Sequence, residues 1–158
     1  MSRRHRAEKR RTAPDSIFKS DVLAKFISKV MIQGKKSIAC RIVYGALEDF
    51  AKRVKKTDNP LEAFEQALEN AKPSLEVKTR RIGGANYQVP VEIPNERRAA
   101  LAMQWIIANA KAKPGRSMVD SLALELADCF NNQGATIKKK DDTHRMAEAN
   151  KAFAHYKW

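Results

Sequence analysis

The sequence predicts a mainly α-helical protein, with about six helices in one bundle-like domain, a protruding two-stranded β-hairpin and a basic N-terminal tail. Two patterns carry this prediction. Apolar residues recur at helical spacing along most of the chain, whereas residues 75–93, LEVKTRRIGGANYQVPVEI, alternate apolar and polar residues on both sides of a glycine pair. With 158 residues, 43% of them hydrophobic, the chain is long enough to bury one core. We expect a flexible tail over residues 1–15, a helical domain over 16–150 that carries the hairpin, and a C-terminal tail over 151–158.

The N-terminal tail is dense in cations and shows no apolar period. We expect it to order only against phosphate groups, and a solvated, disordered terminus is the alternative. The arginines assigned to this role are Arg3, Arg4, Arg6, Arg10 and Arg11.

The first helix is predicted to begin at Ser20 or Asp21, either of which can cap the apolar stripe that follows, and to end at Gly34. Two lysines fall outside this stripe, and two more follow the glycine. The helix dipole explains one lysine near a helix C-terminus, but it does not explain four. We therefore predict a phosphate-binding patch, which consists of Lys25, Lys29, Lys35 and Lys36.

The next two helices follow from the same kind of pattern. A helix over residues 37–56 has an apolar stripe that includes Gly45, where the missing side chain permits close helix packing. Asn59 and Pro60 then supply the N-cap and the first residue of a third helix, which Pro73 ends.

The register of the hairpin depends on its loop. A two-residue loop at Gly83 and Gly84 sets Val77 opposite Pro90, which mixes apolar and polar residues on one face. A three-residue loop over Gly83–Ala85, or one bulge, sets Val77 opposite Val91 and gathers the apolar residues on one side, so we favour this register. At the tip, arginines lie beside glycines that let a partner approach the backbone closely.

The helix predicted from Asn95 to about Lys113 should be the central buried helix, because its middle is apolar nearly all round. Arg97 and Arg98 lie in its first turn, where the helix dipole is already positive. Folding does not explain two cations at this place, whereas an external phosphate does. They follow the hairpin directly and are expected to form one surface with its cations. Those cations are Lys78, Arg80 and Arg81.

The C-terminal third begins with a basic turn at Lys111, Lys113 and Arg116, followed by a helix that Ser117 caps and Gly134 ends. A further basic helical segment then leads to an aromatic C-terminus. This pattern suits stacking on bases, docking on a protein neighbour or folding back on the chain itself, and the three alternatives stay open. The residues concerned are Lys138, Arg145, Phe153, Tyr156 and Trp158.

The charge of the chain indicates a polyanionic partner. Lysine and arginine outnumber aspartate and glutamate by 31 to 18, and the resulting net charge of +13 favours nucleic acid. A structural RNA-binding protein is the first interpretation, and an architectural DNA-binding protein that grips the duplex with a β arm is the alternative. No apolar run is long enough to span a membrane.

The sequence offers little for catalysis. Its histidines lack partners at metal-ligand spacing, and its glycines form neither a phosphate loop nor a dinucleotide fingerprint. Cys40 and Cys129 lie inside apolar helical patterns, which predicts two buried thiols and no disulfide. We therefore expect no enzyme, no metal and no cofactor.

Several longer stretches point to one family. They are GKK at 34–36, VKTRRIGGA at 77–85, YQVP at 87–90 and THRMAEAN at 143–150. Together with the basic tail, they resemble small-subunit ribosomal protein seven of the bacterial or organelle type, over nearly the whole chain. The resemblance implies a cytoplasmic protein of the small ribosomal subunit that binds the 3′ major domain of the rRNA and nucleates assembly of the subunit head.

The resemblance also assigns roles to parts of the chain. The hairpin would approach exit-site tRNA, and the C-terminal part would approach mRNA and ribosomal protein eleven, with ribosomal protein nine as another neighbour. Lys35, Lys36, Arg97 and Arg98 match positive family positions on the rRNA side. The tip that would face tRNA consists of Arg80, Arg81, Ile82, Gly83, Gly84 and Ala85.

Overall fold

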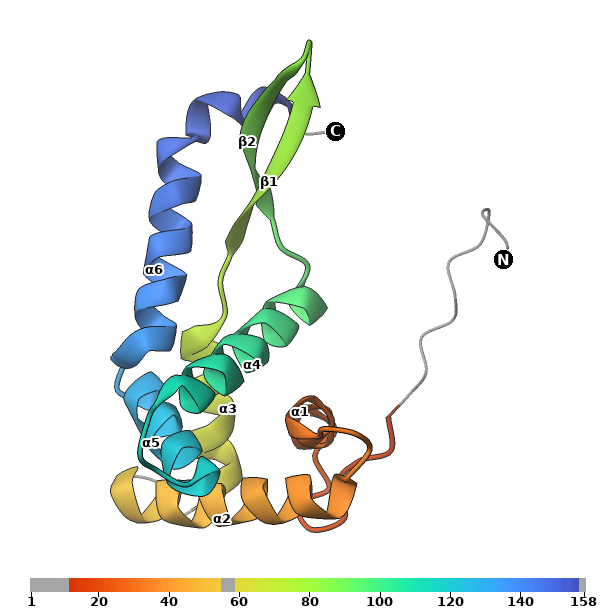
Figure 1. Ribbon diagram of the computed structural model, residues 1–158, viewed down its shortest axis with the longest axis vertical. Helices are drawn as coiled ribbons and strands as arrows, with labels where there is room; N and C mark the ends of the chain where they lie inside the picture. The colour runs from red at the N-terminus through yellow and green to blue at the C-terminus, as the bar shows by residue number, and fades with distance from the viewer. Residues whose placement is uncertain (1–11, 55–58, 157–158) are drawn as a thin grey trace, which may run out of the picture.

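The computed structural model describes residues 12–54 and 59–156. The elements in these ranges are, in order, α1 (Asp21–Val30), α2 (Lys36–Val54), α3 (Pro60–Ala71), β1 (Leu75–Ile82), β2 (Ala85–Glu92), α4 (Asn95–Ala112), α5 (Met118–Phe130), α6 (Gly134–Ala149) and the 3-10 helix η1 (Lys151–Tyr156). Figure 1 shows the hairpin β1–β2, called the arm below, projecting from a helical body while α6 extends along it. The predicted fold class is confirmed. None of the described helices has the length and apolar character needed to cross a membrane.

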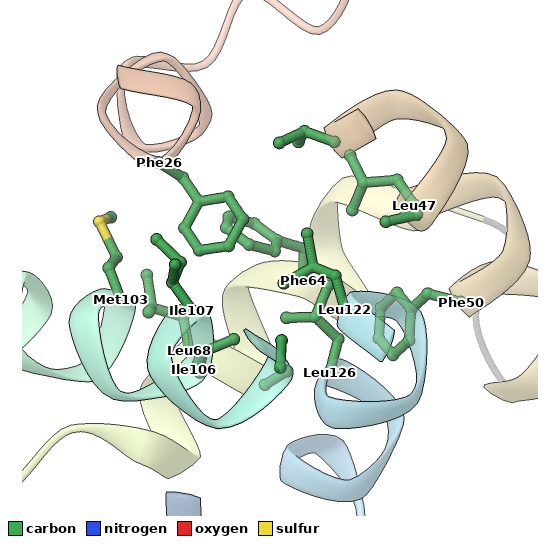
Figure 2. Close-up of a cluster of buried hydrophobic side chains, with 14 of the residues drawn as sticks. Phe26, Leu47, Phe50, Phe64, Leu68, Met103, Ile106, Ile107, Leu122 and Leu126 are labelled. Atoms are coloured by element: carbon green, nitrogen blue, oxygen red, sulfur yellow. The ribbon is translucent and has the colours of Figure 1, made fainter. Parts of the chain in front are cut away.

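A single hydrophobic cluster holds the body together (Figure 2). Phe26 of α1, Phe50 of α2 and Phe64 of α3 are all fully buried in it. The rings of Phe26 and Phe64 meet edge to face, with their centroids 5.2 Å apart. Burying a side chain of this size contributes about 1.5–3 kcal/mol to stability. The cluster therefore ties helices that are distant in sequence into one body.

The central helix of the body is α5 rather than α4. It packs against α2, α3, α4 and α6. The prediction that the helix after the hairpin is buried all round is wrong, because Gln104 and Ala108 of α4 are exposed. Alanine supplies much of the apolar character of α4, and a single exposed alanine costs little. The expected close approach at Gly45 is confirmed, since a Cβ there would lie 3.3 Å from Cγ1 of Val119 on α5.

The predicted helix starts are confirmed at three places. Ser20, Asn59 and Ser117 are the N-caps of α1, α3 and α5. Each accepts a hydrogen bond from a backbone N–H two or three residues later, at 3.4, 3.1 and 3.1 Å respectively. These side chains satisfy N–H groups that have no partner inside the helix, which explains why local sequence was enough to find them.

Two predicted helix ends are wrong. Helix α1 ends at Val30 and not at Gly34. Gly34 lies in the turn before α2, which begins at Lys36, and has a φ of 75°. Gly134 does not end α5 but begins α6, with a φ of 90°. Both glycines do adopt the left-handed backbone that the prediction required. A glycine marks where such a backbone is needed, but it does not tell which of two helices lies beside it.

The register of the arm differs from the favoured prediction. Val77 pairs with Pro90 across a two-residue loop at Gly83 and Gly84, whose φ angles are 58° and 89°. Two positive φ angles are what a tight hairpin turn requires, and adjacent glycines supply them without strain. The apolar-face argument failed because both faces of the arm are partly covered. Val89 is fully buried on one face, while Val77 is half-buried on the other.

Candidate nucleic-acid interface

An open groove of about 1240 Å³ lies between α1 and the N-terminal half of α4. Lys25, Lys29 and Asp21 line it from α1, and Glu96 and Met103 line it from α4. The two lysines are exposed because the apolar stripe of α1 occupies the other side of that helix. Neither lysine forms an ion pair with any acid in the described part of the chain. The α1 side of the groove therefore presents two exposed lysines, beside the acid Asp21.

The N-terminal segment is anchored beside this groove. Residues 12–14 line it, and Asp15 is buried next to them. The Asp15 carboxylate accepts hydrogen bonds from the N–H groups of Ile17 and Phe18, both at 3.1 Å, and from the Tyr44 hydroxyl at 2.6 Å. Burial alone raises the pKa of Asp15, but these hydrogen bonds outweigh it and lower the pKa below its ordinary value. The arginines predicted to bind RNA at positions 3 to 11 lie outside the described residues.

The connection between α1 and α2 carries Lys35 and Lys36 on its surface. Lys36 is the first residue of α2, and the first turn of that helix holds no acid. A helix N-terminus already carries partial positive charge, so a lysine there is unfavourable for folding but suits a bound phosphate. Neither lysine pairs with an acid within residues 12–54 and 59–156.

Arg97 has an acidic partner within the protein. Its Nη2 lies 2.9 Å from Oε2 of Glu76 on β1, and its Nε donates to both oxygens of that carboxylate, at 3.1 and 2.9 Å. Nζ of Lys78 lies 3.3 Å from Oε1 of the same residue. Burial raises the pKa of Glu76, but the hydrogen bonds from Arg97 and Lys78 outweigh it and lower the pKa; Glu76 in turn raises the pKa of Arg97. The argument that folding offers Arg97 no partner is therefore wrong.

Arg98 also has a structural partner. Its Nε donates a hydrogen bond to the carbonyl oxygen of Ile93, at 2.8 Å, just after β2 ends. At the other root of the arm, the N–H of Ser74 donates to Nε2 of His144 on α6, at 3.0 Å. These contacts join α4 and α6 to the two ends of the hairpin. The sequence argument that only an external anion explains Arg98 is therefore wrong as well. Half of the Arg97 side chain still faces solvent.

The tip of the arm is exposed. Arg80 and Arg81 of β1 are on the surface, as are Gly83, Gly84 and Ala85, whereas Ile82 is half-buried. A Cβ on either glycine would meet nothing within 4 Å, so the turn needs glycine for its backbone angles and not for space. The tip therefore presents guanidinium groups and accessible backbone together.

Lys113 has a buried acid as its partner. Its Nζ lies 2.8 Å from Oε2 of Glu125 and 3.2 Å from Oδ2 of Asp128. Glu125 is completely buried, and its other oxygen accepts hydrogen bonds from the N–H and hydroxyl of Thr136, at 3.1 and 2.6 Å. A buried carboxylate requires such compensation. The sequence did not reveal this use of Lys113, and its contact with RNA stays a prediction.

The cations predicted to bind rRNA fall into two groups along α4. Arg97, Arg98 and the lysines of the groove lie near its N-terminal end. Lys111 is in its last turn, and Lys113 and Arg116 follow it. An 18-residue helix is about 27 Å long. The first group forms one end of the body together with the root of the arm, and the second lies at the opposite end of the helix (Figure 1).

The C-terminal segment folds back on the arm. Phe153 and Tyr156 of η1 each have their ring centroid 5.4 Å from that of Tyr87 on β2. For these two residues, the structure shows the third of the three predicted alternatives. Lys138 and Arg145 are exposed on α6, and Trp158 lies outside the described residues. Sequence reasoning did not foresee that Tyr87 binds the C-terminal aromatic residues. The sequence did hold a signal for it, because Tyr87 is an aromatic residue in the otherwise polar outer end of its strand.

The described residues show no grouping of three histidine, cysteine or acidic side chains that could hold a metal ion. Both cysteines are free; Cys129 is buried as predicted, but Cys40 is only half-buried. Burial, together with the nearby charge of Glu125, raises the pKa of the Cys129 thiol to about 12. A thiol with so high a pKa is not a nucleophile at neutral pH.

Comparison with known proteins identifies one family. The family described as "Ribosomal protein S7p/S5e" matches residues 2–151. Proteins called "Small ribosomal subunit protein uS7" are similar over the whole of both chains, with 72% identity in Protochlamydia amoebophila (strain UWE25), 68% in Chlamydia trachomatis serovar L2 and 66% in Chlamydia pneumoniae.

Proposed function

The chain belongs to the ribosomal protein S7p/S5e family, and we propose that it binds the 3′ major domain of small-subunit rRNA and nucleates assembly of the subunit head. Family membership makes the chain a structural protein and not an enzyme. It is a component of the small ribosomal subunit, a cytoplasmic ribonucleoprotein particle that acts in translation.

The observation that carries the proposal is the α1–α4 groove. Lys25 and Lys29 line it without an ion-pair partner among the described residues, and the anchor at Asp15 holds residues 12–14 beside them. Lys35 and Lys36 extend the positive charge to the start of α2. Lysines of this kind bind phosphates and release counterions, which supplies affinity. The rigid helices around them suit recognition of a folded RNA by its shape.

The second part of the proposal concerns the arm and the C-terminus. The exposed arginines and glycines of the tip suit close contact with a tRNA backbone in the exit site. The exposed cations of α6, Lys138 and Arg145, suit mRNA. Ribosomal proteins nine and eleven are the protein neighbours that family membership suggests. Each assignment rests on the family together with the exposure of these residues.

Cleavage protection of small-subunit rRNA tests the proposal. The purified chain should protect one region, in the 3′ major domain, and duplex DNA at the same salt concentration should compete poorly. The variant that combines Lys25→Ala with Lys29→Ala should weaken rRNA binding about tenfold and reduce the salt dependence of log K by about 1.4–1.8 for two lost phosphate contacts. Its melting temperature should not change, because both side chains are exposed.

The matched control combines Lys52→Ala with Arg53→Ala in the last turn of α2. It removes the same formal charge from exposed positions that do not line the groove, although Lys52, unlike Lys25 and Lys29, pairs with Asp49 at 2.9 Å. The control should bind rRNA nearly as tightly as the unmodified chain. Equal losses in the two variants would mean that only net charge matters, and the groove would then have no special role. Protection spread over the whole rRNA would reject specific binding altogether.

A further inference from the structure

The arm is a two-stranded hairpin that projects from the helical body (Figure 1). Two-stranded hairpins are marginally stable in water. The outer half of β1, from Lys78 to Arg81, is exposed throughout. Val89 of β2 is nonetheless completely buried, although it lies in the middle of a strand that projects from the body. Another segment must therefore cover this strand.

Part of this cover comes from α6, which lies against both strands. The rest comes from η1, Lys151–Tyr156, which we call the strap. It packs against β2, and Tyr87 contacts the rings of both Phe153 and Tyr156. The interplanar angles are 60° and 43°, so both contacts are tilted, as favourable aromatic pairs commonly are. Beside them, Nδ2 of Asn150 lies 3.4 Å from Oε1 of Gln88.

Asn150 also sets the course of the strap. Its backbone N–H and its side-chain Nδ2 both donate to the carbonyl oxygen of Met146, at 3.2 and 2.8 Å, and close the C-terminal end of α6. The carbonyl oxygen of Asn150 then accepts a hydrogen bond from the N–H of Phe153, at 3.0 Å, and this bond lies at the start of the strap. One residue thus turns the chain from α6 toward the arm.

The strap itself is weakly held. None of its six residues is buried. Phe153 and Tyr156 are its half-buried side chains, and its other residues are exposed. A segment with so little buried surface opens more readily than a core helix does.

We propose that the strap is a conformational device that fixes the arm to α6, so that strap and arm open together while the helical body stays folded. Docking of the strap stabilises the arm in the projecting position, and release of the strap frees the arm to move about its root. By linkage, anything that holds the arm in this position also favours the docked strap, to the same extent. This inference concerns the free protein and does not depend on RNA binding.

Hydrogen exchange of the full chain tests the inference. The variant that combines Phe153→Ala with Tyr156→Ala removes both aromatic contacts to Tyr87. Peptides over residues 75–92 should then exchange about tenfold faster at short labelling times, because two aromatic pairs are lost. Peptides over α5 should exchange at the unmodified rate. The control is Ala154→Ser, an exposed position in the same short helix, which should leave the arm unchanged.

The reciprocal variant separates coupling from general loosening. Tyr87→Ala should speed exchange of residues 150–156 by a similar factor, whereas Thr79→Ala on the exposed part of β1 should not. If the arm exchanges at the same rate with and without the strap aromatics, the inference is wrong. It is equally wrong if Tyr87→Ala leaves the strap unaffected, or if α5 speeds up as much as the arm in both variants.

Discussion

The helical body buries its apolar side chains in one cluster, whereas the arm keeps most of its residues exposed and is held by a few discrete contacts. Five helices contribute to the cluster, and its largest side chains are completely excluded from solvent. The arm is joined to the body by polar contacts at its root, such as the Glu76–Arg97 ion pair, by packing against α6 and by the strap on Tyr87. Stability in the body is therefore shared by many contacts, while the position of the arm depends on very few. This difference lets one chain combine a rigid platform with a part that can move.

The largest expected effect comes from breaking the body. Phe64→Ala leaves a cavity at the centre of the cluster and should lower the free energy of unfolding by about 3–5 kcal/mol. Denaturant unfolding followed by circular dichroism measures this loss. The control is Phe153→Ala in the strap, which removes the same kind of side chain from a half-buried site. If both variants lost the same stability, the distinction between body and arm would fail.

A smaller effect is expected at the anchor of the N-terminal segment. Tyr44→Phe removes the hydroxyl that donates to Asp15 and should lower the free energy of unfolding by about 1–2 kcal/mol at pH 7. The native pKa of Asp15 is lowered, so its stabilisation is complete above its unfolded pKa of about 3.9 and is lost as the pH falls through the native value.

Unfolding curves of Tyr44→Phe and the unmodified chain at several pH values check this prediction. The difference in stability should be constant near neutral pH and narrow in acid. A difference that grows as the pH falls would contradict the assigned role of the Asp15 carboxylate. Because Phe18 and Tyr44 pack against the core cluster of the helical body, the variant should leave exchange in the arm unchanged.

The smallest effect is expected at the root of the arm. Arg97→Ala breaks an exposed ion pair and should speed hydrogen exchange of residues 75–80 by no more than about fivefold, without altering exchange in α5. High salt should reduce the difference, since it screens the pair. Glu76→Gln should have a similar effect on the arm while retaining Arg97. If Arg97→Ala changed exchange in α5 and not in the arm, its role at the root would be disproved.

Much of the fold could be predicted because its signals are local. The caps at Ser20, Asn59 and Ser117 depend on neighbours within one turn, and so does the glycine pair of the hairpin. The prediction of the hairpin register failed because two signals in the same stretch disagreed. The apolar residues of the arm suggested a longer loop, but the backbone preference of Gly83 and Gly84 decided the turn.

The candidate site was predicted less completely than the fold. Lys25 and Lys29 were correctly assigned to the exposed side of α1, because helical spacing defines which residues face away from the core. The assignments of Arg97 and Lys113 did not foresee their acidic partners, which lie on β1 and α5. Charge can be counted in a sequence, but the acid that compensates it cannot be located there.

The sequence by itself determined the mainly helical fold, three of the helix starts, the presence of a hairpin and the excess of positive charge, because each depends on composition or on spacing within a short stretch. Only the tertiary structure decided that Glu76 binds Arg97, that Glu125 binds Lys113 and that the C-terminal aromatics close on Tyr87. Those contacts join positions that are far apart in the chain. Their existence depends on how packed helices orient one another, and no local pattern encodes that orientation.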